Sequence, residues 1–308
     1  MRKPWWVLLL LLAAAPIPVW GAEEATVKAV VDGDTVVLES AVMGAEQVRL
    51  VGIQAPKLPL ERRNFPTWPL AAESKKALEN LTLGKTVTLI FGGSEKDRHG
   101  RLLAHLTRRD GTWVQGEMLK KGMARVYSFA DNRARVAAML ALEAEAREAR
   151  RGIWGLRFYA VRTPEELSSW IGTFQLVEGK VLKAARIKGR VYLNFGDDWK
   201  TDFTVTIGVP ARRMFRKAGT DPLSLEGKRI RVRGWLKKYN GPMIAATHPE
   251  QIEVVTRGED GGTPDRETTT GEDGGTPDRE TTTGEDGGTP DRETTTGGDG
   301  GTPDRDKK

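Results

Sequence analysis

Three charged side chains, set in segments typical of strands and turns, have the chemistry to grip a phosphodiester. Asp34 lies in the turn-like run Val31-Asp32-Gly33-Asp34-Thr35, Arg49 lies in a later apolar run, and Arg101 follows a second turn signal. Planar guanidinium groups bind phosphate oxygens in a bidentate way. One carboxylate with two arginines therefore indicates phosphodiester binding or cleavage.

The order and spacing of these segments resemble the staphylococcal-nuclease-like (thermonuclease) family over residues 26–155. The resemblance implies that Asp34 ligates calcium, that Arg49 binds the phosphate and that Arg101 stabilises the leaving oxygen. It also implies a five-stranded OB-type barrel with helices.

The segment after the Arg49 strand departs from that family. The family pattern is roughly Val-Asp-x-Pro-Glu, in which the Asp is the second acidic calcium ligand and the Glu is the general base. This chain has Ile53-Gln54-Ala55-Pro56-Lys57. Gln54 therefore stands at a metal-ligand position as a weak, neutral ligand, and Lys57 stands at the position of the general base.

These two replacements predict weak or absent calcium binding and impaired catalysis. Calcium affinity follows the number of anionic oxygen ligands, and Lys57 adds a cation where calcium would sit. A protonated lysine accepts no proton, and a positioned general base is typically worth about 10² to 10⁴ in rate. Phosphate binding survives more easily, because Lys57 takes up part of the space and charge of the missing metal.

Three functions remain open at this point. The first is an exported nucleic-acid-binding protein of this family with an impaired site. The second is an active phosphodiesterase that cuts DNA or RNA with a different base or metal arrangement. The third is an envelope interaction module. Whether the chain is an enzyme is therefore unsettled, and nucleic acid is the expected partner.

The charge distribution favours a polyanionic partner. The 308 residues carry a formal net charge of +6. Residues 258–308 hold 15 acidic and 6 basic residues, so the rest of the chain is strongly basic. A basic folded region indicates polyanion binding. The alternative is that these charges serve only to keep the protein soluble. The chain has no cysteine, so stability in an oxidising compartment must come from packing alone.

The first 22 residues have the pattern of a secretory signal peptide. Arg2 and Lys3 precede an apolar run from Trp5 to Ala15, and small residues follow near position 22. The run is short for a bilayer span. The pattern predicts a periplasmic or secreted protein without a stable membrane span after cleavage, and the alternative is an uncleaved membrane anchor.

Periodicity predicts the elements of a first domain over residues 23–156. Strands are expected near 26–31, 35–38, 47–53, 85–91 and 101–107, and helices near 71–81 and 114–121, with a long helix that begins at Ser128 or Asp131 and ends at Gly152. The segment 58–69 is proline-rich and cationic, and its aromatic side chains either stack on nucleic acid or pack over the domain edge. We expect structural roles for His99 and His105, and solvated charges at Glu61 and Glu73.

A linker with a short helix is expected over 157–172, with Thr163 as its cap and Pro164 at its first position. A second, smaller OB-like β-barrel domain is expected over 173–256. Its strand around Gly227–Trp235 alternates cations with apolar residues. There are two interpretations of its cations, which are Lys228, Arg229, Arg231 and Arg233. They form a phosphate track, with Trp235 or Tyr239 as a stacking surface, or they form a solvated strand face.

The remaining residues, 257–308, contain a 13-residue repeat that begins at Gly258, Gly271, Gly284 and, in degraded form, Gly297. The repeat has no large apolar side chain to bury. We therefore expect a disordered tail that is either passive or competes with an acidic ligand. The fold class as a whole is β-rich α+β.

Overall fold

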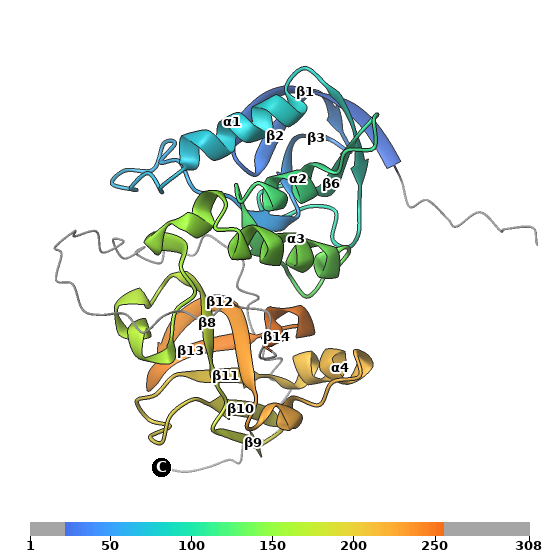
Figure 1. Cartoon of the computed structure of the whole chain (residues 1–308). Coiled ribbons are helices and arrows are strands. Elements are labelled where there is room, and N and C mark those ends of the chain that lie inside the picture. The colour runs from blue at the N-terminus through green and yellow to red at the C-terminus, as the bar shows by residue number, and fades with distance from the viewer. Residues whose placement is uncertain (1–21, 256–308) are drawn as a thin grey trace, which may run out of the picture.

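The computed structural model describes residues 22–255 and arranges them as two β-rich parts, one above the other in Figure 1. The predicted signal peptide and repeat tail lie outside the described residues. No helix within residues 22–255 is long and apolar enough to cross a membrane.

The first part is a closed barrel with the strand order β1-β2-β3-β6-β5. These strands are β1 (Ala22–Asp32), β2 (Thr35–Val42), β3 (Ala45–Leu50), β5 (Thr86–Ile90) and β6 (Leu102–Arg108). The first strand is long enough to pair with β5 through its first half and with β2 through its second half. Strand β3 pairs in parallel with β6. This confirms the predicted five-stranded OB-type barrel.

Three helices and one small ribbon complete the first part. The helices are α1 (Ala71–Thr82), α2 (Val114–Lys120) and α3 (Val136–Glu148). The ribbon pairs β4 (Gly52–Gln54) with β7 (Arg125–Tyr127). The prediction for α3 was wrong at its start: the helix begins at Val136, after Arg135 in a left-handed conformation, and neither Ser128 nor Asp131 caps it. Apolar side chains of the barrel and all three helices form one buried core.

Short 3-10 helices connect the two parts: η1 (Gly152–Gly155), η2 (Arg157–Tyr159) and η3 (Pro164–Trp170). Thr163 precedes η3, and its backbone amide donates a 2.8 Å hydrogen bond to Glu166 Oε2. Pro164 opens the helix, where a missing amide proton costs nothing.

The second part contains β8 (Phe174–Lys180), β9 (Lys183–Ile187), β10 (Arg190–Asn194), β11 (Thr204–Ile207), β12 (Arg229–Tyr239), β13 (Gly241–Ala246) and β14 (Ile252–Val254). Helix α4 (Val209–Lys217) and the short helices η4 (Pro222–Leu225) and η5 (Pro249–Gln251) cover it.

The strand pairing of the second part repeats that of the first. Strand β8 pairs antiparallel with β12, the strand that follows the helix, and β11 pairs in parallel with β13. Strand β9 continues β8 after a two-residue break and pairs with β10. This connectivity, with a helix between the third and fourth strands, is that of an OB fold whose first strand is split.

The two parts share buried polar contacts. Arg233 on β12 is 1 % exposed and donates to Glu143 on α3 at 2.8 Å and to Glu253 on β14 at 2.5 Å. Arg231 is also buried and pairs with Glu178. The predicted phosphate track on β12 was therefore wrong, because two of its four cations lie inside the molecule. The predicted stacking residue Trp235 donates to the Tyr127 hydroxyl, whereas Tyr239 is exposed.

Candidate active site

The turn between β1 and β2 fixes the position of Asp34. Gly33 has no room for a side chain: a Cβ atom there would lie 2.0 Å from Ser74 Oγ and 2.6 Å from the Ala55 Cβ. The turn is therefore pressed between α1 and the segment that follows β4. In that arrangement the Ala55 amide donates a 2.7 Å hydrogen bond to Asp34 Oδ2, which holds the buried carboxylate in place.

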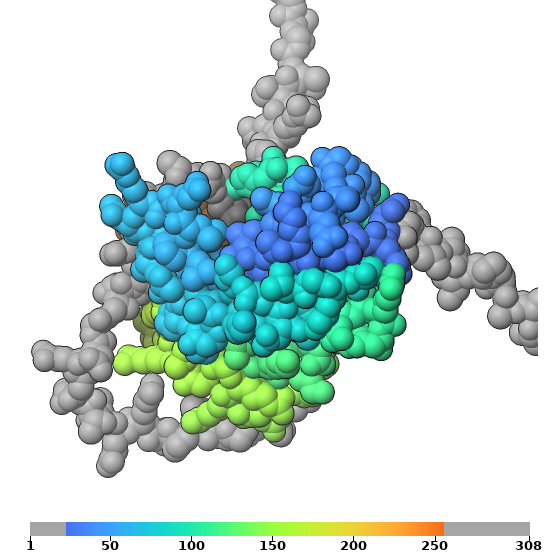
Figure 2. Space-filling model, turned by 90° about the horizontal axis from the view of Figure 1, so that it is seen from above, coloured from blue at the N-terminus to red at the C-terminus, as the bar shows by residue number. Residues whose placement is uncertain are grey.

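Lys57 points at this carboxylate. Its Nζ atom lies 3.0 Å from Asp34 Oδ1, 2.9 Å from Asp34 Oδ2 and 3.3 Å from Asp32 Oδ2. The lysine side chain is 16 % exposed, and that of Asp34 is fully buried. Residues 60–64, a few positions after Lys57, are exposed, and in Figure 2 the light-blue residues of this stretch and of α1 lie beside the darker blue residues near the N-terminus of the described chain.

Arg49 approaches the same carboxylate from β3. It lies opposite Thr35 in the β2–β3 register, and one of its terminal nitrogens lies 3.3 Å from Asp34 Oδ2. The guanidinium also donates to the carbonyl oxygens of Leu50 and Ile53, each at 2.8 Å. Most of its donors therefore bind the protein itself, and its side chain is 13 % exposed.

The surrounding charges shift the pKa values of the two carboxylates of the turn in opposite directions. Burial alone would raise the pKa of Asp34, but the charges of Arg49 and Lys57 hold it well below the ordinary range. Burial and the neighbouring Asp34 charge raise the pKa of Asp32. Asp34 is thus the firmly ionised member, and Asp32 takes up a proton first as the pH falls.

Gln54 faces away from Asp34. Its side-chain oxygen accepts hydrogen bonds from Arg125 Nε at 2.9 Å and from Arg125 Nη2 at 2.7 Å. Arg125 is 5 % exposed, and its guanidinium lies 4.7 Å from the ring centre of Phe174, a residue of the second part. The structure thus does not bring the predicted weak metal ligand Gln54 to the carboxylates.

Arg101 lies in the turn before β6 and pairs with Asp97, with two nitrogen–oxygen distances of 2.7 Å. Its side chain is 28 % exposed. No hydrogen bond or ion pair joins Arg101 to Asp34, Arg49 or Lys57 in the described chain. The structure therefore brings together Asp34, Arg49 and Lys57, and holds Arg101 in its own turn.

The donor set at the turn does not fit a calcium ion. Two carboxylates meet two cationic side chains, so the cluster is already neutral, and the Lys57 ammonium contacts both oxygens of Asp34. Within residues 22–255, no group of three or more His, Cys, Asp or Glu side chains is arranged to hold a metal ion. Calcium prefers several anionic oxygens, and this site leaves none uncompensated.

Other candidate groups lie apart from the cluster. His105 is buried, accepts from the Trp113 indole and contacts the Ala134 carbonyl oxygen, as expected of a structural histidine. His99, Glu61 and Glu73 are exposed.

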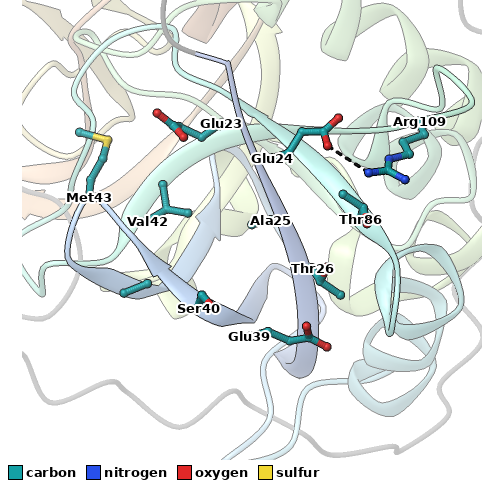
Figure 3. A pocket seen from close by; sticks show the side chains of 11 residues that line it. Glu23, Glu24, Ala25, Thr26, Glu39, Ser40, Val42, Met43, Thr86 and Arg109 are labelled. Atoms are coloured by element: carbon teal, nitrogen blue, oxygen red, sulfur yellow. Dashed lines mark hydrogen bonds and ion pairs between the residues drawn. The ribbon is translucent and has the colours of Figure 1, made fainter.

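A hollow of about 550 Å³ opens between β1 and β2 and is drawn in Figure 3. It is lined by Glu23, Glu24 and Glu39, with Arg109 paired to Glu24 at 3.1 Å. Its carboxylates repel phosphate, so the hollow is no extension of the phosphodiester site.

Two residues of this region escaped the sequence interpretation. Asp32 is the first acid of the same Asp-Gly-Asp turn, and the spacing of the two acids could have indicated that Asp32 belongs to the site. Arg125 belongs to β7, a three-residue strand with no distinct pattern, and its contact with Gln54 depends on the β4–β7 pairing.

The barrel, its covering helices and the Asp-Gly-Asp turn define a protein of the staphylococcal nuclease type. The family model for staphylococcal nuclease homologues matches residues 47–155. An uncharacterized endonuclease of Escherichia coli O157:H7 is 33 % identical over 126 residues, which is 41 % of this chain and 72 % of the relative. The chain belongs to the staphylococcal nuclease homologue family.

Two further relatives show how the similarity is distributed. Endonuclease YhcR of Bacillus subtilis is 33 % identical over 146 residues, which is 46 % of this chain but only 12 % of that protein. The thermonuclease of Staphylococcus hyicus is 28 % identical over 141 residues, or 43 % of this chain and 78 % of the relative. These matches cover less than half of this chain and connect it to nucleases that act on nucleic acid.

Proposed function

We propose that the chain binds nucleic acid through its phosphodiester groups, at a site whose calcium and general-base functions are impaired. The single observation that carries this proposal is the contact of the Lys57 ammonium with both oxygens of Asp34. An ammonium at that place supplies positive charge without a metal, and it accepts no proton from water.

Each residue of the cluster has a role in this proposal. Asp34 holds the Lys57 ammonium in position, and Arg49 adds a second cation beside it. Outside the cluster, Arg101 has a side chain that is 28 % exposed and a guanidinium oriented by Asp97. In this proposal a phosphodiester contacts the partly exposed donors of these side chains, and the position of the family's general base holds Lys57 instead of a carboxylate.

The test is one assay of the full chain on single- and double-stranded DNA and RNA, with calcium, magnesium, manganese or a chelator. We expect salt-sensitive binding without turnover under every condition. A Lys57→Glu, Gln54→Asp variant runs beside the unmodified chain, and calcium-dependent cleavage in that variant alone supports the impaired site. Efficient cutting by the unmodified chain with calcium contradicts the proposal, as does an absence of binding.

A metal-independent phosphodiesterase is the second candidate, favoured by the fixed position of the Lys57 ammonium. In that case cleavage persists with chelator and disappears in Lys57→Gln, Arg49→Ala and Arg101→Ala. A third possibility, an envelope interaction module, predicts neither binding nor cleavage of nucleic acid.

We further propose that the protein is exported, because residues 1–22 have the composition of a secretory signal. Cell fractionation with mass analysis of the N-terminus tests this. An uncleaved protein that remains in the cytoplasm contradicts it.

A further inference from the structure

The second part of the chain carries a concentration of cations that the Asp34–Lys57 site does not use. Residues 183–190, which form β9, its turn and the start of β10, contain four Lys or Arg residues and no acid. Residues 204–220, which include α4, contain another four and again no acid. Surfaces that serve only solubility usually mix both signs of charge.

The fold brings these two segments together. Arg212 on α4 donates a 2.5 Å hydrogen bond to the Gly189 carbonyl oxygen in the β9–β10 turn. A Cβ atom at Gly189 would lie 3.2 Å from the Val209 side chain. The turn therefore rests against the beginning of α4. We call the resulting set the hairpin–helix surface, which consists of Arg186, Lys188, Arg190, Arg212, Arg213 and Arg216.

The cations of the hairpin–helix surface are not neutralised. Five of the six are exposed, and Arg212 is half-buried. No salt bridge to a described carboxylate involves any of them, whereas Arg229, Arg231 and Arg233 on β12 each have at least one. Six unpaired cations at one end of a small fold create a local positive potential that attracts a polyanion.

The neighbouring side chains indicate which parts of a nucleic acid the hairpin–helix surface could contact. The exposed apolar residues in this region are aliphatic: Ile187 is 57 % exposed and Val209 is 45 % exposed. Sequence-tolerant stacking of unpaired bases requires aromatic side chains. Without an exposed aromatic side chain for stacking, binding at the hairpin–helix surface should depend chiefly on phosphate contacts, so single strands and duplexes should bind there alike.

We propose that the hairpin–helix surface binds the phosphate backbone of nucleic acid, as a contact separate from the Asp34–Lys57 site. This proposal rests on the proposed function and extends it. Strands β9 and β10 lie at the end of the second part that is farthest from the first barrel in Figure 1.

The test compares two triple variants of the full chain that lose the same charge. The first is Lys188→Gln, Arg213→Gln, Arg216→Gln. The control is Lys200→Gln, Lys237→Gln, Lys238→Gln, which removes three exposed cations elsewhere in the same part. Affinity for a 40-base-pair duplex and for a single strand of the same length is measured by fluorescence anisotropy from 50 to 200 mM salt, with chelator present.

We expect the first variant to lose about tenfold to a hundredfold in affinity, and the slope of log K against log salt to fall by about 2.7 on duplex DNA. The control should lose less than threefold. Equal losses in both variants, or no loss in the first, overturn the proposal. The unmodified chain is also tested on anionic phosphatidylglycerol vesicles. If it binds these vesicles but not nucleic acid, the proposal is overturned in favour of a membrane surface as the ligand.

The outcome for the proposed function is read separately, in a calcium cleavage assay on the same samples. Cutting by the unmodified chain contradicts the impaired site and leaves the binding comparison intact. Normal binding by the first variant contradicts only the hairpin–helix surface.

Discussion

The Nζ atom of Lys57 lies 2.9 Å from Oδ2 and 3.0 Å from Oδ1 of Asp34, so a cation carried by the chain itself bridges both oxygens of this carboxylate. In a nuclease fold whose relatives include endonucleases, this pair places a side-chain cation at the turn of the site. Its consequences for stability and ion binding are measurable.

Replacement of Lys57 by Gln should destabilise the protein and create a response to calcium. Removal of Lys57 leaves Arg49 as the remaining cationic partner of Asp34, so the cost in the free energy of unfolding should stay below about 3–5 kcal/mol, the cost of a buried charge left without any partner. Calcium at millimolar concentration should restore part of this loss, and thermal denaturation with and without calcium measures it. Lys28→Gln is the control, because Lys28 forms an exposed pair with Glu46. If calcium does not raise the thermal stability of Lys57→Gln, this description of the site is contradicted.

Replacement of Gln54 by Glu should stabilise the protein without producing a metal site. The side-chain oxygen of Gln54 accepts two hydrogen bonds from the buried Arg125, whose pKa burial lowers to about 10. A carboxylate of the same length compensates that charge, and hydrogen bonds to charged groups contribute about 1.5–3 kcal/mol. Urea denaturation measures the gain. Gln54→Met, which removes the acceptor, should be destabilised, and equal stability of the two variants contradicts the assigned contact.

Replacement of Arg233 by Met should cost about 3–5 kcal/mol in the free energy of unfolding, because Glu143 is then left buried without its main cation. Urea denaturation monitored by tryptophan fluorescence measures this. The matched control is Arg229→Met on the same strand, since Arg229 forms a more exposed pair with Glu178 and should cost about 1 kcal/mol or less. A double variant, Arg233→Met with Glu143→Leu, should recover most of the loss.

Stability should fall as the pH drops from about 6.5 to 4. Burial lowers the pKa of His105 and that of His248, each to about 4, from an ordinary value near 6.5. A depressed folded-state pKa means that the unfolded chain binds more protons in this window, so the stabilisation is complete above pH 6.5 and is lost below it. Two such groups give a slope of up to about 2.7 kcal/mol per pH unit.

Unfolding by urea at several pH values tests this, with His248→Gln expected to halve the slope. His99→Gln is the control, because His99 is exposed in the turn before Arg101. An unchanged slope in His248→Gln would show that its ring is not buried neutral.

The barrel could be predicted because its signals are local. Alternating apolar residues in β1, β2 and β3, and glycines at the turns, locate the strands without knowledge of their partners. The Asp-Gly-Asp turn and the Arg49 strand fixed the candidate site for the same reason, since Asp34, Arg49 and Lys57 lie within 24 residues of sequence. The resemblance placed Lys57 where calcium would sit, and in the structure its ammonium contacts Asp34.

The contacts between the two parts could not be predicted from local patterns. Alternation in β12 indicated cations on one face, and a strand face is solvated or buried according to what packs on it. Here α3 supplies Glu143 and β14 supplies Glu253, so Arg233 is buried. Gln54 was misjudged as a metal ligand for a similar reason, because Arg125 reaches it through the β4–β7 pairing, 71 residues away in sequence.

The Arg233–Glu143 pair also limits how this molecule can be divided. An excised nuclease half that ends near residue 156 would retain the Glu143 carboxylate without its guanidinium, and Arg125 would lose the ring of Phe174 that covers it. The appended β domain is thus no independent module: either half alone would lose the Glu143–Arg233 pair and expose the aromatic side chains that pack between the halves.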